Sequence, residues 1–284
     1  MRYRGAILSI YLVRTTVNNL REQSDVQANI ECAMNLVRPI PGFLMDNEVR
    51  FLGTLAACIP AKGAIVEIGS YKGKSTVMLA HIAAEYETGP VVAIDPHEGL
   101  SYLGEVAEQY RAPTFDDFLQ NLRSAGVAAH VEAHRARSED VARQWNRPIR
   151  FLWIDGDHSY HGCKQDFELF APFLVDGAVV AFHDALNAFE GPIRVFLEQI
   201  LRSDQFGPAG FVHSIAWSQF RPRDGAKFRE QRGWLAERCA KLIPFVRGGQ
   251  EPLGIRKRVY KFLRWRIPKK LVTPEQWLAS ITPS

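Results

Sequence analysis

The sequence predicts an α/β fold with a mostly parallel sheet. Short runs typical of strands recur along the middle of the chain, at 65–69, 91–95, 130–136, 151–155 and 178–182, and all but the third are mostly apolar. Stretches of helical character follow most of these runs, and this alternation is typical of parallel strands joined by crossover helices. Two of the runs end in aspartate, which predicts acidic side chains at the sheet edge where such folds bind ligands.

Three regions are expected along the chain. Residues 1–45 are interpreted as an N-terminal helical lid or extension, and the helical pattern breaks at 38–46, where two prolines and a glycine occur. Residues 46–220 contain the strand and helix alternation, which ends with a predicted strand or hairpin at 211–220. Residues 221–284 form a basic, aromatic C-terminal extension.

The composition is that of a globular protein. The chain has 284 residues, 46% of them hydrophobic and 23% charged, enough to bury a substantial core. Its four cysteines are scattered without metal-ligand spacing and predict packing roles in a reducing compartment. The apolar stretch at 2–14 is too short to span a bilayer and lacks a cleavage pattern, so we expect a cytoplasmic protein.

A glycine-framed loop follows the first apolar run. Gly69 and Gly73 allow tight turning and close approach of the backbone to a ligand. The helix after this loop would present its first N–H groups and positive dipole end to a carboxylate or phosphate. Asp95, at the end of the next run, is suited to accept hydrogen bonds from a ribose diol. The pattern predicts a nucleoside cofactor with an attached acid.

Three cofactor classes compete for this loop. A dinucleotide fingerprint requires G-x-G-x-x-G, but Tyr71 occupies the place of the second glycine. A phosphate-binding loop requires G-x-x-x-x-G-K-[ST], and residues 69–75 are one residue too short. A P-loop-like nucleotide hydrolase or kinase stays open as an alternative, because the run at 151–155 also looks like the strand and aspartate that hold magnesium in such enzymes. S-adenosylmethionine is the third class.

Residues 65–80, IVEIGSYKGKSTVMLA, resemble the first motif of class I S-adenosylmethionine-dependent methyltransferases, especially the catechol O-methyltransferase type. The resemblance implies a doubly wound, seven-stranded, Rossmann-like sheet with helices on both faces. It also implies the cofactor contacts: Glu67 and Gly69 would flank the methionine, Ser75 would meet its carboxylate and Asp95 would hold the ribose. The full set of cofactor-binding candidates is Glu67, Gly69, Ser70, Tyr71, Gly73, Ser75, Asp95, Arg137 and Ser138, of which the last two are expected at the adenine.

A second group of ionisable residues follows the fourth and fifth runs. Because parallel strands end at one edge of the sheet, these side chains are expected to converge. Carboxylates suit a hard cation such as magnesium, which keeps positions for water and substrate oxygens. The group consists of Asp155, Asp157, His158, His183 and Asp184.

The segments IDGDHSY and AFHD are similar to those of metal-dependent sugar O-methyltransferases of macrolide biosynthesis. The resemblance implies a metal on Asp155 and Asp184 and a general base at His158, with Asp157 as a rival base. His183 stands where relatives place an acid, and we include it in the candidate metal set. Imidazole binds magnesium poorly, so this departure admits manganese or no metal.

These observations predict an S-adenosylmethionine-dependent O-methyltransferase. The expected acceptor is a hydroxyl of a small molecule, namely a sugar, a glycosylated natural product or a glycolipid, with Mg²⁺ or Mn²⁺ assisting. A non-catalytic methyltransferase-like binding module is a further alternative. The sequence leaves open whether chains associate as a homo-oligomer.

Basic charge is concentrated at the C-terminal end. Residues 221–284 hold 16 Lys or Arg and 5 Asp or Glu, a net of +11, whereas residues 1–220 hold 19 and 26, a net of −7. Within this end, residues 254–270 interleave cations with aromatic and aliphatic side chains, as in helices that lie on anionic membranes. A peripheral membrane contact is therefore predicted beside the plainer interpretation of a solvated basic helix docked by its aromatics. A nucleic-acid partner is not expected.

Overall fold

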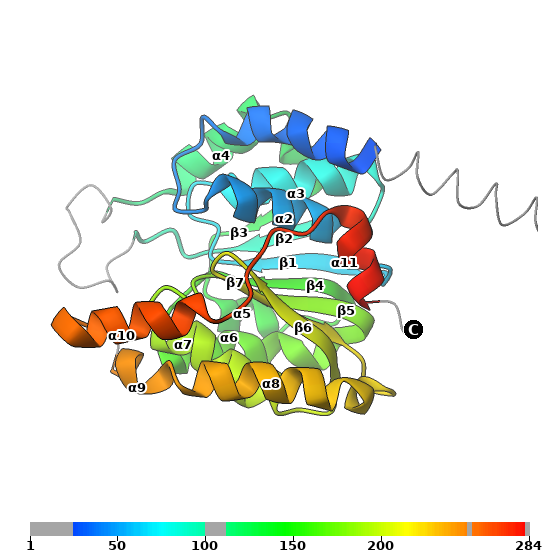
Figure 1. The fold of residues 1–284 in the computed structure, drawn as a ribbon. Coiled ribbons are helices and arrows are strands. Elements are labelled where there is room, and N and C mark those ends of the chain that lie inside the picture. Colours follow the sequence, from blue (N-terminus) through cyan, green and yellow to red (C-terminus); the bar gives the residue numbers. More distant parts are fainter. Residues whose placement is uncertain (1–24, 100–111, 249–251, 282–284) are drawn as a thin grey trace, which may run out of the picture.

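The computed structural model describes residues 25–99, 112–248 and 252–281. The predicted N-terminal element at 2–14 lies outside these ranges. The described residues build one seven-stranded sheet between two layers of helices (Figure 1). No helix within these ranges combines the length and the apolar character needed to cross a bilayer.

The strand order is β3-β2-β1-β4-β5-β7-β6. The strands are β1 Ala64–Ile68, β2 Val91–Ile94, β3 Val131–His134, β4 Ile149–Ile154, β5 Leu174–Phe182, β6 Phe206–Val212 and β7 Ile215–Phe220. Neighbours from β3 to β5 pair in parallel, and β7 pairs antiparallel with β5 and β6. The predicted doubly wound, mostly parallel seven-stranded fold is confirmed, and the last two strands form the expected hairpin, with β6 starting at Phe206.

Alternate residues of the strands feed two cores. Ile65 of β1 and Phe151 of β4 pack on one side, whereas Val66 and Leu152 pack on the other. The first core is covered by a helix over residues 25–37 and by α2 Asp46–Cys58, α3 Lys74–Glu85, α4 Phe115–Ser124 and α11 Pro274–Ile281. The second is covered by α5 Ser138–Ala142, α6 Tyr160–Phe170, α7 Glu190–Val195, α8 Arg229–Ala240, α9 Ile243–Val246 and α10 Gly254–Trp265 (Figure 1).

Part of the basic C-terminal region belongs to the second core. Leu235 and Cys239 of α8 and Tyr260 of α10 are buried against the same cluster as the strands. The Arg232 guanidinium is also buried and donates hydrogen bonds to the carbonyls of Phe206 and Gly225. These contacts tie α8 and α10 to the sheet, while the three-part division of the chain stays a prediction.

Candidate active site

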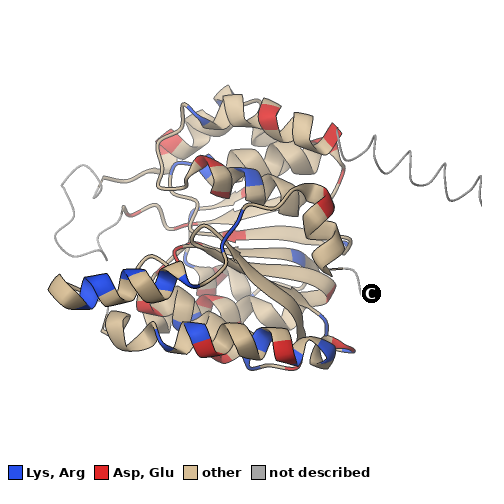
Figure 2. Ribbon diagram, in the orientation of Figure 1, with Lys and Arg blue, Asp and Glu red and all other residues tan. Residues whose placement is uncertain are grey.

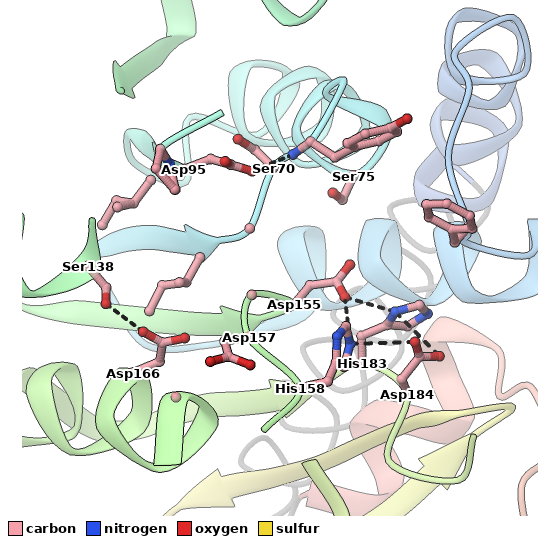
Figure 3. A pocket seen from close by; sticks show the side chains of 18 of the residues that line it. Ser70, Ser75, Asp95, Ser138, Asp155, Asp157, His158, Asp166, His183 and Asp184 are labelled. Carbon is pink, nitrogen blue, oxygen red and sulfur yellow. Dashed lines mark hydrogen bonds and ion pairs between the residues drawn. The ribbon is translucent and has the colours of Figure 1, made fainter. Parts of the chain in front are cut away.

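A cavity of about 690 Å³ opens at the carboxyl ends of the parallel strands. Its walls come from the loops after β1, β2, β4 and β5, as expected for a doubly wound sheet. Figure 3 shows the two groups predicted from the sequence in this one cavity: Ser70, Ser75 and Asp95 on one side, Asp155 and His158 on the other. Of the predicted site residues only Glu67 and Gly73 do not line it.

Two glycines shape the loop between β1 and α3. Gly69 has φ +87°, and a Cβ there would lie 2.2 Å from the carbonyl oxygen of Asp155. Gly73 has φ +89° and caps the start of α3 in the left-handed conformation. Both positions favour glycine because other residues rarely adopt these angles and would clash at Gly69. The loop therefore turns tightly across the end of β4 and exposes the first turn of α3 to the cavity.

Asp95 is held by the backbone on both of its oxygens. The N–H of Tyr71 donates to one carboxylate oxygen at 2.8 Å, and the N–H of His97 donates to the other at 2.6 Å. The carboxylate lines the cavity and is about 16% exposed. Since each oxygen can accept a second hydrogen bond, the group is fixed in a position to receive a diol.

Beneath the loop, Glu67 is fully buried and Ser75 is nearly so. The Thr76 hydroxyl donates to the Glu67 carboxyl at 2.5 Å. Burial raises the pKa of Glu67 to about 8, and the hydrogen bonds from Ser75 and Thr76 oppose that rise. A neutral carboxyl at pH 7 fits a structural position under the loop, whereas Ser75 reaches the cavity.

Arg137 and Ser138 line the far end of the cavity, near α5. The Ser138 hydroxyl donates to Asp166 at 2.5 Å (Figure 3). Burial raises the pKa of Asp166 to about 6. Sequence reasoning missed Asp166, although an acid on the helix face that also carries Cys163 and Phe170 is a detectable signal of a buried polar role.

An acid and histidine cluster occupies the other end of the cavity. His158 Nε2 lies 3.6 Å from an oxygen of Asp155 and 3.5 Å from an oxygen of Asp184. The His158 ring packs against Phe189, with centroids 4.6 Å apart. Burial would raise the pKa of Asp155, but His183 and His158 together bring it below its usual value. The cluster thus places His158 beside the carboxylates of Asp155 and Asp184.

His183 lies between two carboxylates. Its Nδ1 is 2.9 Å from Asp155 and its Nε2 is 3.4 Å from Glu48. Burial lowers the pKa of His183, but Asp155 and Glu48 outweigh it and raise the pKa well above its usual value. Glu48 also accepts hydrogen bonds from Met45 N, His213 Nδ1 and the backbone and hydroxyl of Ser214. A charged imidazole engaged on both nitrogens is poorly suited to bind a metal.

Glu48 was not among the residues predicted from the sequence. It lies on the same face of α2 as the buried Leu52 and Leu55. An acid inside an apolar helix stripe is a sign that a buried partner exists. The partners, His183 and Ser214, are far away in sequence, so only the fold identifies them.

Asp157 stabilises the turn that precedes α6. Its carboxylate accepts from the N–H of Ser159 at 2.7 Å and from the Ser159 hydroxyl at 2.9 Å. Figure 3 shows it between Asp166 and His158, apart from the group formed by Asp155 and Asp184. This turn geometry is a structural use of the side chain.

Asp184 begins a short loop after β5 and has φ +55°, an uncommon angle for a residue other than glycine. Asn187 holds it, donating from Nδ2 to a carboxylate oxygen at 2.6 Å. The loop is fixed from outside by Tyr260 of α10, whose hydroxyl donates to Leu186 O and accepts from Ala188 N, both at 2.9 Å. The position of Asp184 therefore depends on α10.

Residues 66–185 match a family described as a methyltransferase domain. The solved O-methyltransferase NovP is 16% identical, with 61% of this chain and 80% of NovP covered and a TM-score of 0.50. Cofactor-bound Rv0187 from MTB is 19% identical, with 76% and 97% covered and a TM-score of 0.49. CalS11, described as a TDP-rhamnose 3'-O-methyltransferase of calicheamicin biosynthesis, is 18% identical, with 68% and 93% covered and a TM-score of 0.44.

The family match runs from within β1 to the residues just after β5 and includes most of the loops that line the cavity. Residues 66–185 are thus similar to a methyltransferase domain, and the strand order is that of the doubly wound sheet predicted for S-adenosylmethionine-dependent methyltransferases. This similarity favours the methyltransferase prediction over the nucleotide hydrolase or kinase alternative. It agrees with the fixed Asp95 carboxylate and the loop too short for phosphate wrapping.

Proposed function

We propose that the protein transfers the methyl group of S-adenosylmethionine to a hydroxyl oxygen of a small molecule. The observation that carries this proposal is the position of His158. Its Nε2 lies 3.5 to 3.6 Å from Asp184 and Asp155, in the same cavity as the candidate cofactor loop. A base flanked by carboxylates is what an oxygen acceptor requires, because a hydroxyl is a poor nucleophile until its proton is removed.

In the proposed reaction, Nε2 of His158 takes the acceptor proton as the oxygen attacks the methyl carbon. The new carbon–oxygen bond forms while the carbon–sulfur bond breaks, and the sulfonium becomes a neutral thioether. Asp155 and Asp184 stabilise the imidazolium that results. The main contribution of the cavity is alignment of oxygen, carbon and sulfur in one line, with water excluded.

A divalent ion is proposed as an assistant. Asp155, His158 and His183 each offer one ligand atom within 4.8 Å of the others, and Asp184 adds a carboxylate beside them. Asp155 and Asp184 fit such an ion best, because His183 is engaged by Asp155 and Glu48. When bound, Mg²⁺ or Mn²⁺ would lower the pKa of a coordinated hydroxyl.

The acceptor is proposed to be a sugar, a glycosylated natural product or a glycolipid. Phe43 and Phe189 line the cavity and offer apolar ring faces, and Asn187 offers a polar side chain near the base. Apolar faces with a few directed polar groups suit the alternating surface of a sugar ring. The motifs around Asp155 and Asp184, which resemble those of sugar O-methyltransferases, favour the same class.

Turnover of labelled S-adenosylmethionine with a panel of glycosides and glycolipids tests this function. His158→Gln should lower kcat by about 10²- to 10⁴-fold, the usual contribution of a general base. His161→Gln is the matched control, because His161 is exposed on the adjoining helix. Equal rates for both variants would contradict the role of His158. No methyl transfer to any acceptor, despite cofactor binding, would favour the non-catalytic alternative.

Chelation tests the metal separately. Activity lost with EDTA and restored by Mg²⁺ or Mn²⁺ supports the ion. Activity that survives EDTA and also survives Asp155→Ala combined with Asp184→Ala would contradict it.

We further propose that the protein is cytoplasmic and contacts anionic membranes through α10. One side of α10 exposes four apolar side chains, namely Ile255 (78%), Val259 (41%), Phe262 (55%) and Trp265 (74%). Tyr260, on the opposite side of the helix, is buried. The aromatics Phe262 and Trp265 are thus not docked on the protein. Lys and Arg lie along the same helix (Figure 2), and exposed apolar residues flanked by cations fit an anionic lipid surface.

Co-sedimentation with phosphatidylglycerol vesicles tests this contact. Phe262→Ser combined with Trp265→Ser should abolish sedimentation and leave the fold intact, since both side chains are exposed. Trp234→Ser is the control, because Trp234 is 42% exposed on α8. Unchanged binding of the double variant, or equal loss in the control, would contradict the proposal.

A further inference from the structure

A second cavity, of about 310 Å³, lies between α10 and the loop that follows β5. Asn187 and Ala188 of the loop line one side, and Tyr260 lines the other. The remaining polar lining comes from three cations of α10, namely Lys257, Lys261 and Arg264. These cations are spaced i, i+4 and i+7, so they lie on one face of the helix.

The second cavity adjoins the catalytic end of the first. Asn187 lines both cavities, and its Nδ2 donates to Asp184 at 2.6 Å. The Tyr260 hydroxyl, which is buried between them, bonds to Leu186 O and Ala188 N. A molecule that occupies the second cavity would therefore touch the residue that holds Asp184.

The described residues that line this cavity carry positive charge only. No acidic residue is among the described residues that line it. Within the described ranges Lys261 and Arg264 form no salt bridge, and Lys269 donates to the carbonyl of Arg264, which adds a further cation nearby. Burial and, to a smaller extent, proximity to Arg264 lower the pKa of Lys269. Like charges held together repel one another, and an anion would relieve that repulsion.

We propose that the second cavity binds a phosphoryl group of the acceptor. This inference rests on the proposed O-methylation and names its substrate class: a glycosyl phosphate or diphosphate whose hydroxyl reaches His158 past Asn187. Two lysines and an arginine suit phosphoryl oxygens, since arginine binds them in a bidentate manner and lysine acts as a point charge. The phosphoryl group belongs either to a soluble diphosphate or to a lipid headgroup.

Calorimetry on the full-length protein, loaded with S-adenosylhomocysteine, tests the site with two probes. Inorganic pyrophosphate represents the soluble source, and monomeric dihexanoylphosphatidic acid represents the lipid headgroup. Lys261→Gln combined with Arg264→Gln should weaken binding of the preferred probe by about 10- to 100-fold, because two charge-assisted contacts are lost. The tighter of the two probes identifies the source.

Arg258→Gln combined with Arg266→Gln is the matched control. It removes the same charge from the same part of the chain, but both residues are exposed and neither lines the cavity. Unchanged probe binding in the control, with loss in the Lys261 and Arg264 variant, supports the site. Equal weakening in both variants, or binding of neither probe to the wild type, overturns it.

Failure of the proposed O-methylation would look different. Probe binding does not require methyl transfer, so a protein that binds pyrophosphate through Lys261 and Arg264 but methylates no hydroxyl would refute the reaction and keep the anion site. A protein that methylates glycosides without any phosphate, with the same KM in the Lys261 and Arg264 variant, would keep the reaction and refute the site.

Discussion

Replacing Glu48 by glutamine should destabilise the protein strongly. Glu48 is 1% exposed and accepts hydrogen bonds from Met45 N, His213, Ser214 and His183. Burial would raise the pKa of Glu48, but His183 and the other donors hold it far below its usual range. The carboxylate is therefore ionised and paired in the core.

The size of the expected loss in the free energy of unfolding depends on the hydrogen bonds that glutamine cannot accept. One amide oxygen can still accept from Ser214 and His213, but the amide nitrogen then faces the N–H of Met45 and Nε2 of His183. A backbone hydrogen bond is lost, and the charged His183 loses one of its two partners. Breaking a buried ion pair on one side costs about 3–5 kcal/mol, and we expect Glu48→Gln to fall in that range at pH 7.

Urea unfolding followed by circular dichroism measures this cost. Glu31→Gln is the control, because Glu31 pairs with Arg50 at 2.7 Å but is 44% exposed, and such a pair contributes about 1 kcal/mol or less. The stability that Glu48 provides is present above its unfolded pKa of about 4.3 and disappears as pH falls through its lower folded pKa. A cost for Glu48→Gln no larger than that for Glu31→Gln would show that Glu48 is not an ionised, buried partner of His183.

Three further predictions concern buried and loop residues. Glu67 has a pKa of about 8 in the folded protein and about 4.5 in the unfolded chain, so the free energy of unfolding of the wild type falls between pH 4.5 and pH 8. Glu67→Gln should be as stable as the wild type at pH 4 and more stable by about 3–5 kcal/mol at pH 8. A stability difference that does not change with pH would contradict this. Gly69→Ala should lower the free energy of unfolding in urea by at least about 2 kcal/mol more than Gly126→Ala does. Both glycines have positive φ, but of the two only Gly69 has atoms within 4 Å of the added Cβ, so equal losses would argue against a clash there. Asp157→Asn should leave kcat within about twofold of the wild-type value, because asparagine can form the same turn with Ser159. A fall in kcat as large as that caused by His158→Gln would indicate that Asp157 is the general base.

The fold was predictable because its signals are local. The runs at 65–69 and 151–155 are continuous and apolar, and strands buried on both faces need such runs. Gly69 and Asp95 were predictable for the same reason, since each stands directly after a strand whose end fixes its place. The carboxyl ends of parallel strands meet at one edge, which brought Asp155 and Asp184 together as expected.

Residues whose role depends on tertiary packing were harder to find. Glu48 meets His183 only because α2 covers the end of β5, and the sequence does not specify that packing. The division of labour between Asp157 and His158 depends on side-chain direction, which neighbouring positions in one motif do not reveal. The anchoring of the Asp184 loop by Tyr260 joins residues more than seventy positions apart.

The cavity beside Asp95 is expected to bind S-adenosylmethionine. Calorimetric titration of S-adenosylhomocysteine into the wild type and into Asp95→Asn tests this binding most directly. Asparagine cannot accept from both backbone N–H groups and both ribose hydroxyls. We therefore expect a measurable Kd for the wild type and a Kd at least about tenfold higher for the variant. Equal affinity of the two proteins would show that Asp95 does not hold the ribose, and no binding by the wild type would show that the cavity is not a cofactor site.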